Sequence, residues 1–357
     1  MQRAWSLING EVEPGRGAVF WTAFVCLAAF MAILPLFVGR FTILNMNSFL
    51  LMSFMAMGLA LLWGVAGILS LGQSAFVGLG GYAYGVLAIN FANVTGQTPL
   101  ALIGGVATAV LLAAIMSWII FYGRLRGVYV AIITLVMALL FETFLNQTAG
   151  PQWLVGTAHL GGNNGLGRFS GDIQELPSLS VGPGSWAIEL SGPSLQLYYA
   201  NLMLLIICYV LLRMLVNSRF GLALNAIRED QERTETLGYD VRLLQSIVFC
   251  IGAALAALSG VLYVSWGNFI TPSMFGVASN ILPVIWVAVA GRRSLFAAIV
   301  GAVVLQWASQ ALALQGEYAL IVLGAMLVIA VLLLPEGLIS LATRRPRPQV
   351  GGAGHAP

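Results

Sequence analysis

Residues 64–85 read GVAGILSLGQSAFVGLGGYAYG and lie between two long apolar stretches. Gly81 and Gly85 form a G-x-x-x-G pair, and Ser74 and Gly78 repeat the same spacing with small residues. Small residues at this spacing let the backbones of membrane helices approach each other closely. The segment therefore predicts a tightly packed helix inside a membrane-spanning bundle.

Polar residues mark the point at which this helix should enter the membrane. We predict that the helix is bent or broken between Ser70 and Ser74 and that it lines a solute path, because irregular backbone at membrane depth is tolerated where it borders a cavity. Close helix packing alone is the alternative interpretation. The candidate pathway or packing residues are Ser70, Gly72, Gln73, Ser74, Gly78, Gly81 and Gly85.

The composition of the whole chain also indicates a membrane setting. Of 357 residues, 59% are hydrophobic and 8% are charged, whereas soluble proteins carry about 25% charged residues. We predict an all-α, polytopic transmembrane helical bundle of about eight to ten spans, each needing about 20 mostly apolar residues. The apolar runs are 19–38, 47–63, 73–90, 100–121, 127–147, 197–216, 243–265, 277–290, 294–314 and 318–334.

The run 277–290 is too short to cross a bilayer straight, and it contains Pro283. Proline removes a hydrogen bond from the turn before it. We therefore expect this helix to be tilted, broken or only half-spanning. If it fails to span, the two ends of the chain lie on opposite sides of the membrane.

The arginines set the orientation of the bundle. Cytoplasmic loops of membrane proteins carry an excess of Lys and Arg. With the N-terminus inside, only Arg40 and Arg168 fall outside, and every other Arg falls on the cytoplasmic side. We therefore predict an even number of spans with both termini in the cytoplasm.

Two long polar stretches interrupt the apolar runs. Residues 148–196 are rich in Gly, Pro and Ser and form the predicted outer loop, whereas residues 217–242 mix Arg with acids and form the predicted cytoplasmic loop. The inner loop lacks Pro, and its Ala and Leu recur at helical spacing, so we expect one or two short interfacial helices that end at Gly238. The predicted organisation is a cytoplasmic N-terminal segment (1–18), a transmembrane domain (19–341) and a disordered cytoplasmic tail (342–357).

The charged and reactive residues exclude several classes of function. All 16 basic residues are Arg, so the chain lacks the Lys that a Walker A loop needs, and any ATP hydrolysis requires another subunit. The three cysteines lie in apolar runs without metal-ligand spacing, and the two histidines, His159 and His355, are far apart. We expect no cofactor, no metal site, no catalytic residue and no nucleic-acid binding.

Glu142 is the one acidic residue within a predicted span and away from its extreme ends. Ionisable groups inside a membrane are costly and usually functional, so Glu142 is a candidate pathway residue. It also lies near the outer end of its run. The alternative is therefore an acid that reaches the lipid headgroup region.

The inner loop carries both signs of charge at close spacing. Such a segment between two spans suits docking onto a soluble partner through complementary charge. A loop that is merely solvated is the alternative interpretation.

Six motifs in the same order resemble one family, the permeases of the branched-chain amino acid and urea/amide class of ABC importers. The resemblance covers roughly residues 47–341. Gln73 stands where the family usually has His, and Gly81 where it usually has Ala. The motifs are GVAGILSLGQSAFVGLGGY (64–82), RLRGVYVAIITL (124–135), LGGNNGL (160–166), SRFGLALNAIREDQERTETLGY (218–239), ITPSMF (270–275) and LPEGL (334–338).

The resemblance implies a LivM-type permease of a bacterial inner membrane. It implies a second, homologous permease subunit, two cytoplasmic ATP-binding subunits and an extracytoplasmic solute-binding protein as partners. It also identifies the inner loop as the segment that couples the permease to the ATPases. The coupling residues implied are Arg228, Glu229, Asp230, Gln231, Glu232, Arg233, Leu237 and Gly238.

Two motifs bear on the solute. VIWVAVAGR (284–292) and GGNNGL look more like the urea-type members, whereas Ala290, Thr234 and Thr236 depart from the family pattern. These features slightly favour urea or a short amide over branched-chain amino acids. A self-sufficient secondary transporter or channel is the competing hypothesis, and it would need broken helices or intramembrane charges for ion coupling.

Overall fold

The computed structural model describes residues 9–10, 12–15, 17–95, 98–167, 176–177, 179–181, 188–190 and 194–313. Within these ranges, eight helices are long and apolar enough to cross a membrane. Three of them continue into a short 3₁₀ or π-helical segment. The eight are α2 (Gly17–Ile33) with η1 (Leu34–Leu36), α3 (Arg40–Leu59) with η2 (Ala60–Val65), α4 (Gln73–Thr95), α5 (Pro99–Ser117) with η3 (Trp118–Tyr122), α6 (Val128–Asn146), α7 (Leu195–Val216), α10 (Val241–Gly267) and α12 (Leu295–Ala313).

The expected polytopic all-α bundle is therefore confirmed. Each apolar run from 19–38 to 243–265, and the run 294–314, coincides with one of these helices. The predicted last span, 318–334, and the predicted tail, 342–357, lie outside the described residues. So do part of the outer loop, with Arg168, and the first eight residues of the predicted N-terminal segment.

Shorter helices complete the architecture. The 14-residue α11 (Val277–Ala290) follows the 3₁₀ turn η6 (Pro272–Phe275) and contains Pro283, so the prediction of a short, incomplete span is confirmed. Between α7 and α10 lie α8 (Arg219–Glu229) and α9 (Gln231–Thr236). They are the two short helices expected in the inner loop.

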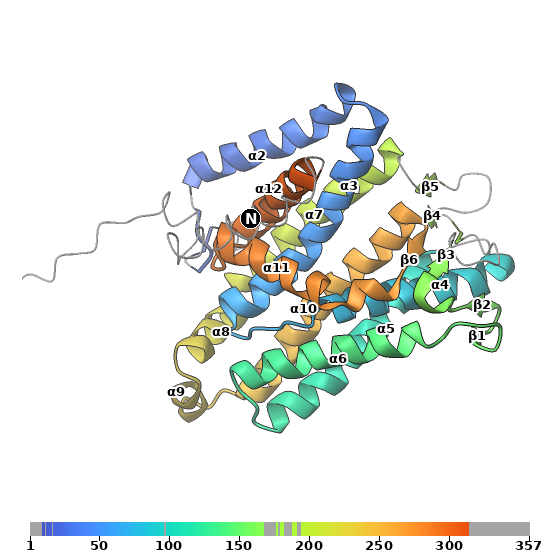
Figure 1. Ribbon diagram of the computed structural model, residues 1–357. Coiled ribbons are helices and arrows are strands. Elements are labelled where there is room, and N and C mark those ends of the chain that lie inside the picture. The colour runs from blue at the N-terminus through green and yellow to red at the C-terminus, as the bar shows by residue number, and fades with distance from the viewer. Residues whose placement is uncertain are drawn as a thin grey trace, which may run out of the picture.

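Short antiparallel strand pairs gather at the end of the bundle opposite α8 and α9 (Figure 1). The pair formed by β3 (Leu166–Gly167) and β6 (Phe269–Ile270) joins the loop after α6 to the segment after α10. The other two pairs lie wholly within the loop between α6 and α7. They are β1 (Leu154–Val155) with β2 (Ala158–His159), and β4 (Leu179–Val181) with β5 (Ile188–Leu190).

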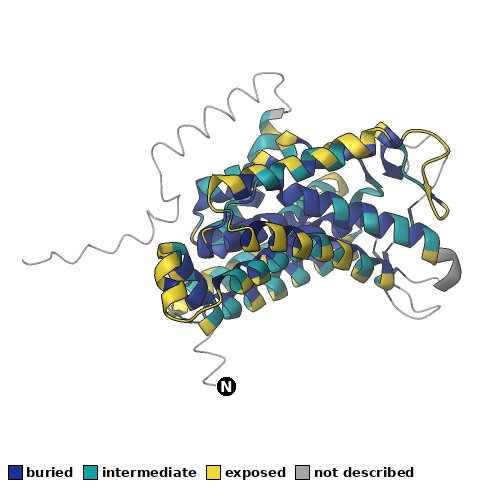
Figure 2. Ribbon diagram, turned by 90° about the horizontal axis from the view of Figure 1, so that it is seen from below, coloured by how far each residue is buried: buried dark blue, intermediate teal, exposed yellow. Residues whose placement is uncertain are grey.

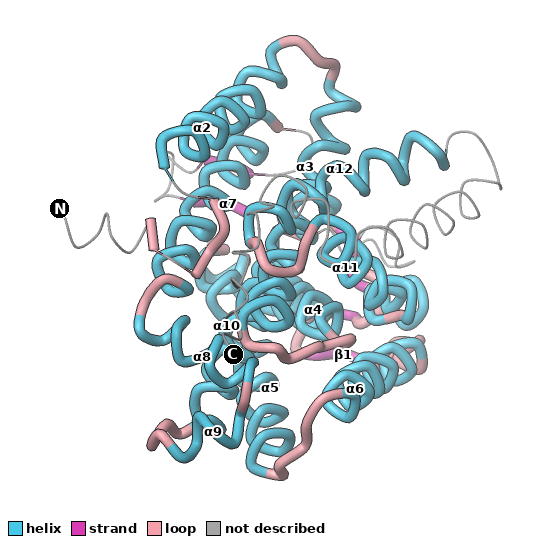
Figure 3. Tube along the Cα trace, turned by 90° about the vertical axis from the view of Figure 1, so that its left-hand side faces the viewer, coloured by secondary structure: helices cyan, strands magenta, loops and turns pink. Residues whose placement is uncertain are grey.

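The centre of the bundle is the packing of α4 against α10, which is the most extensive contact between two helices. In the view of Figure 3, this pair lies between α3 and α12 on one side and α5 and α6 on the other. The close approach depends on missing side chains. A Cβ on Gly260 would lie 1.9 Å from the Val77 carbonyl oxygen, and a Cβ on Gly80 would lie 2.8 Å from the Ala257 backbone.

Burial is graded from this centre outward, as Figure 2 shows. The helices α2, α5 and α6 carry many exposed large apolar side chains, among them Val19, Leu111 and Tyr129. In water such a surface would be unfavourable, but in a bilayer it faces hydrocarbon of similar polarity. The outer surfaces of these helices therefore suit a hydrocarbon environment.

Replacing Gly260 with Ala should destabilise the protein, by about 2 kcal/mol or more, because the added methyl group meets backbone rather than a movable side chain. Gly104→Ala is the matched control, since its methyl group would meet only the end of the Leu87 side chain within van der Waals reach. The apparent melting temperature of the detergent-purified chain measures both effects. Equal melting temperatures for the two variants would contradict the close packing of α4 on α10.

Candidate functional site

A non-helical segment separates η2 from α4, at residues 66–72. The sequence predicts non-helical backbone near Ser70–Ser74; the structure places it at residues 66–72, where it connects two separate spans instead of interrupting one helix. Protein groups satisfy its backbone: the Ile68 N–H donates to the Leu62 carbonyl at 2.9 Å, and the Leu71 N–H donates to Thr134 Oγ1 at 3.2 Å. Gly67 is exposed, whereas Ile68, Ser70 and Gly72 are buried, so the later part of the segment lies inside the bundle.

Gly72 explains how the segment fits against α6. A Cβ at this position would lie 2.1 Å from the Thr134 carbonyl oxygen. A side chain here would push the break away from α6 and remove the hydrogen bond from Leu71. Gly72 is thus needed for close approach, as the packing interpretation expects.

Three polar side chains at the start of α4 are almost completely buried: Ser70, Gln73 and Ser74. Their side-chain oxygen and nitrogen atoms have no hydrogen-bond partner within the described part of the chain. A buried polar group without a partner costs about 1–3 kcal/mol. This cost makes the three side chains the best candidates in the bundle interior for contact with a polar solute.

Asn280, near the start of the short helix α11, connects this helix to the first turn of α4. Its Oδ1 accepts a hydrogen bond from the Ser74 N–H at 3.3 Å, and its Nδ2 donates to the carbonyls of Phe275 and Gly276 at 2.8 and 2.9 Å. The first turns of α4 and α11 therefore meet inside the bundle. Our sequence analysis missed Asn280, although an amide at the fourth position of an apolar run and three residues before Pro283 is a detectable signal.

The predicted glycines further along α4 serve packing. Cβ atoms on Gly78, Gly81 and Gly85 would meet Phe275, Ile270 and Leu166 at 2.2–2.4 Å. These contacts hold α4 against the β6–η6 segment and β3. Ser74 borders a cavity between α3, η6, α11 and α12, and none of the three glycines lines that cavity.

A cavity of about 330 Å³ lies beside Ser74, between α3, η6, α11 and α12. Its wall is mainly apolar and includes Met52, Met55 and Trp286. From α4, Ser74 lines the cavity. The cavity therefore lies between an apolar wall and the first turn of α4.

Glu142 lies outside this cavity. Its Oε1 is next to the backbone of Gly276, so that a Cβ there would be 3.1 Å away. A carboxylate at a helix N-terminus is favoured by the helix dipole, and Gly276 directly precedes α11. The geometry makes Glu142 a neighbour of the α11 N-terminus, and whether it also borders a solute path stays a prediction.

The inner loop is built by side-chain caps. Ser218 begins α8 by accepting the Phe220 N–H, Asp230 begins α9 by accepting the Arg233 N–H at 3.0 Å, and Asp240 begins α10 by accepting the Leu243 N–H. Such caps stabilise a helix start by about 1 kcal/mol. The loop therefore has a defined helical shape.

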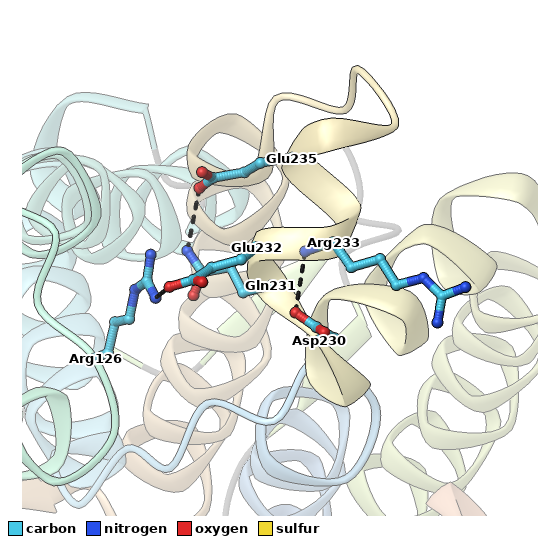
Figure 4. Close-up of polar contacts among 6 residues, drawn as sticks. All are labelled: Arg126, Asp230, Gln231, Glu232, Arg233 and Glu235. Carbon is cyan, nitrogen blue, oxygen red and sulfur yellow. Dashed lines mark hydrogen bonds and ion pairs between the residues drawn. The ribbon is translucent and has the colours of Figure 1, made fainter.

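Most of the predicted coupling residues lie on the exposed surface of this loop. Figure 4 shows the polar contacts around α9, where the Arg126 guanidinium lies 3.3 Å from the Glu232 carboxylate. Leu237 is 69% exposed, and Tyr239, two residues later, is also exposed. The exposed members are Glu229, Asp230, Glu232, Arg233, Leu237 and Gly238, and Gln231 is half-buried.

Arg228 differs from the other predicted coupling residues because its side chain turns inward. Its Nη1 donates to the Gly64 carbonyl at the end of η2, and its aliphatic carbons pack against Gly67 in the break. Burial, and then the nearby Arg293 and Arg292, lower the pKa of the Arg228 guanidinium from its usual value. Arg228 thus ties the inner loop to the beginning of the break.

The N-terminal residues 9–15 form a strap across the inner ends of α7 and α12. The Glu13 carboxylate accepts a hydrogen bond from the Leu295 N–H at 2.8 Å, at the start of α12. Asn217 accepts the N–H groups of Val12 and Glu13. Buried Arg213 donates to the Gly15 carbonyl and to the Tyr209 hydroxyl.

Sequence reasoning did not find this strap. Arg213 had the pattern of a membrane-flanking charge, and Glu13 had no distinguishing context. Burial raises the pKa of Glu13 to about 7, although Arg213 and the Leu295 N–H oppose the change.

Comparison with known proteins adds a separate line of support. Residues 41–331 match the family model described as the permease component of branched-chain amino acid transport systems. The high-affinity branched-chain amino acid transport system permease protein LivM of Escherichia coli is 26% identical over 88% of this chain and 73% of its own length. LivM of Salmonella typhimurium is 27% identical over 83% and 68%, and the probable permease LivM of Methanocaldococcus jannaschii is 28% identical over 64% and 63%. No solved structure matches the chain.

The raised pKa of Glu13 makes the stability of the strap depend on pH. A carboxyl whose pKa rises on folding contributes most stability below its unfolded value of 4.5, and this contribution is lost as pH rises towards 7. The full loss is about 3 kcal/mol. Glu13→Gln should therefore melt progressively higher than the unchanged protein between pH 5 and pH 8.

Thermal unfolding of the detergent-purified protein at several pH values measures this difference. Glu235→Gln, on the exposed surface of α9, is the matched control and should show no such trend. A pH-independent difference for Glu13→Gln would contradict the assignment.

Proposed function

Because the chain belongs to the family of permease components of branched-chain amino acid transport systems, we propose that it is the membrane-spanning permease subunit of an ATP-driven importer. The match over residues 41–331 carries this proposal. The multi-pass bundle agrees with it, since eight described helices can cross a membrane. The membrane would be the inner membrane of a bacterium, with both termini in the cytoplasm.

The importer needs other chains to work. The sequence contains no Lys and so no Walker A loop, and two separate cytoplasmic ATPases would supply the energy. A second, homologous permease would complete the membrane part, and an extracytoplasmic binding protein would deliver the solute. This chain would perform no covalent chemistry.

The inner loop is the part that we expect to meet an ATPase. Its exposed surface combines both signs of charge with the exposed side chains of Leu237 and Tyr239. Charge complementarity gives orientation, and a central apolar side chain gives binding energy. Movement of an ATPase would then shift α8 and α9 relative to the bundle.

Arg228 offers a route from that movement to the interior. It bonds the Gly64 carbonyl, and the break that follows leads within a few residues to Ser70 and Ser74. Two alternative packings of this region, one open to each side of the membrane, would be biased by the state of the ATPases. Arg228 acts in this scheme as a positioning residue, not as a solute contact.

Branched-chain amino acids are the solutes we propose. The relatives described above carry branched-chain amino acid names in Escherichia coli, Salmonella typhimurium and Methanocaldococcus jannaschii. The motifs 284–292 and 161–166 had slightly favoured urea or a short amide. Solute choice between these classes is measurable in the same uptake experiment that tests the function.

A self-sufficient secondary transporter or channel is the second candidate. The short helix α11, which meets the first turn of α4 inside the bundle, is the feature that favours it, because interrupted helices often hold coupling ions. Proteoliposomes separate the two candidates. Leucine uptake that requires the ATPases, the binding protein and ATP supports the importer. Uptake by this chain alone under an ion gradient would contradict the importer.

The docking surface can be tested by Leu237→Asp. A charged side chain at the centre of a contact should weaken ATPase association about tenfold or more, because a desolvated carboxylate has no partner there. Leu154→Asp in β1, which changes another exposed leucine outside the inner loop, is the control. Co-purification of the ATPase with the tagged permease measures the effect, and equal recovery for both variants would contradict the assignment.

Arg228→Gln tests the proposed relay separately from docking. The variant keeps the exposed surface but shortens the side chain that reaches Gly64. We expect ATPase association to stay normal while leucine uptake per ATP hydrolysed falls severalfold. Loss of association in this variant would show that Arg228 belongs to the docking surface instead.

A further inference from the structure

The cavity beside Ser74 has two chemically different ends. Phe49, Met52 and Met55 of α3 and Ile285 and Trp286 of α11 form most of its apolar wall. Its volume of about 330 Å³ is within the range of small-ligand pockets, about 300–1,000 Å³. Methionine side chains adapt to aliphatic groups of different branching. This wall suits an aliphatic side chain.

The polar end is formed by Ser74 of α4 and Gln306 of α12. Both line the cavity, and both have a buried polar atom without a hydrogen-bond partner among the described residues, Ser74 Oγ and Gln306 Nε2. Ser74 is only 1% exposed. Because such atoms cost free energy until they are paired, they indicate a ligand with polar groups at this end.

The dipole of helix α4 makes the polar end of the cavity electrostatically positive. Ser74 is the second residue of the 23-residue α4, whose N-terminus carries a positive partial charge. Nothing on α4 neutralises it, because its first turn contains no acidic residue. An anionic oxygen of a ligand is therefore favoured beside Ser74.

The described lining of the cavity contains no Asp, Glu, Arg or His. A ligand with a net charge would be unpaired there, in a medium of low dielectric constant, whereas a ligand with no net charge would not. The amide and hydroxyl groups of Gln306 and Ser309 supply oxygens that can accept hydrogen bonds from an ammonium group. The site therefore fits a zwitterion with an apolar side chain.

We propose that this cavity binds a neutral aliphatic α-amino acid during transport, with its carboxylate at Ser74 and the α4 N-terminus and its side chain against Met52, Met55 and Trp286. The inference rests on the proposed importer function and adds the place in this chain at which the solute is recognised. Glu142 is not part of the site, since it borders the start of α11 instead.

The same features argue against other occupants. Urea has no apolar part and would leave the methionine and tryptophan wall facing polar groups. A lipid chain, or an apolar helix of the second permease, would leave Ser74 Oγ and Gln306 Nε2 unpaired. Only a ligand that is polar at one end and aliphatic at the other satisfies both ends.

Protection of an engineered cysteine tests the site directly. The three native cysteines are replaced with Ala, and Ser309→Cys is introduced into the cavity wall. The complete transporter, with ATPases and second permease, is treated with a small uncharged thiol reagent with or without leucine. Ser246→Cys in α10 is the matched control, because it lines a different groove.

We expect leucine to slow alkylation of Cys at 309 about fourfold when it fills three quarters of the sites, and to leave alkylation at 246 unchanged. Urea and lysine at the same concentration should not protect. Ser74→Ala should raise the half-protecting leucine concentration about tenfold, through loss of a hydrogen bond to a charged group. Ser246→Ala, which removes another buried hydroxyl without a partner, should not change it.

Three results would overturn the proposal. If the complex imports leucine but leucine does not protect position 309, the site is wrong and the importer function stands. Equal protection by urea would show that the apolar wall does not select the ligand. A cysteine at 309 that reacts in the isolated permease but not in the complete transporter would show that the second permease covers the cavity. If the complex imports no leucine, the proposed importer function is contradicted, whatever the protection experiment shows.

Discussion

The backbone of residues 66–72 is the constraint on which this structure depends. A chain segment that leaves the helix inside a bilayer exposes N–H and C=O groups that hydrocarbon cannot satisfy. Here the Ile68 N–H bonds to the Leu62 carbonyl, and the Leu71 N–H bonds to the Thr134 side chain. The second bond needs α6 close to the segment, and the missing side chain of Gly72 permits that closeness. The same need for a missing side chain recurs at the α4–α10 contact, where Gly260 lies against the Val77 carbonyl.

The break also explains why charge is distributed so unevenly. The cavity next to Ser74 has no charged side chain in its described lining, whereas Arg228, Arg292, Arg293 and Glu13 gather at the inner end. A permanent charge in the interior would bind a counter-charge and hold one packing of the helices. Buried charges at the inner end can instead link segments that move together, as Arg213 links the N-terminal strap to α7. Uncharged dipoles in the interior and charged links at the edge suit a structure with two packings.

Sequence patterns predicted the parts of the fold that follow from local chemistry. Apolar runs gave the helices, Gly-rich spacing gave the tight packing of α4, and the polar cluster at residues 70–74 gave the break. They did not give Asn280 or the strap at Glu13, because both depend on contacts between segments more than 190 residues apart, as in the bonds from Val12 and Glu13 to Asn217 and from Asn280 to Ser74. The sequence also did not show that the Arg228 side chain points into the bundle. The adjacent Glu229 and Asp230 are exposed, and only the position of Gly64 in space turns the Arg228 side chain inward.

The apolar wall and the polar break are adjacent for a geometric reason. α11 is too short to span, so the chain before it must return into the bundle as β6 and η6. That return places Phe275 against Gly78 and Asn280 against Ser74. The remaining turns of α11 then run beside α3 and α12, and their side chains form the cavity wall. A full-length α11 would begin at the membrane surface and would leave Ser74 without either neighbour, so the incomplete helix creates the amphipathic pocket.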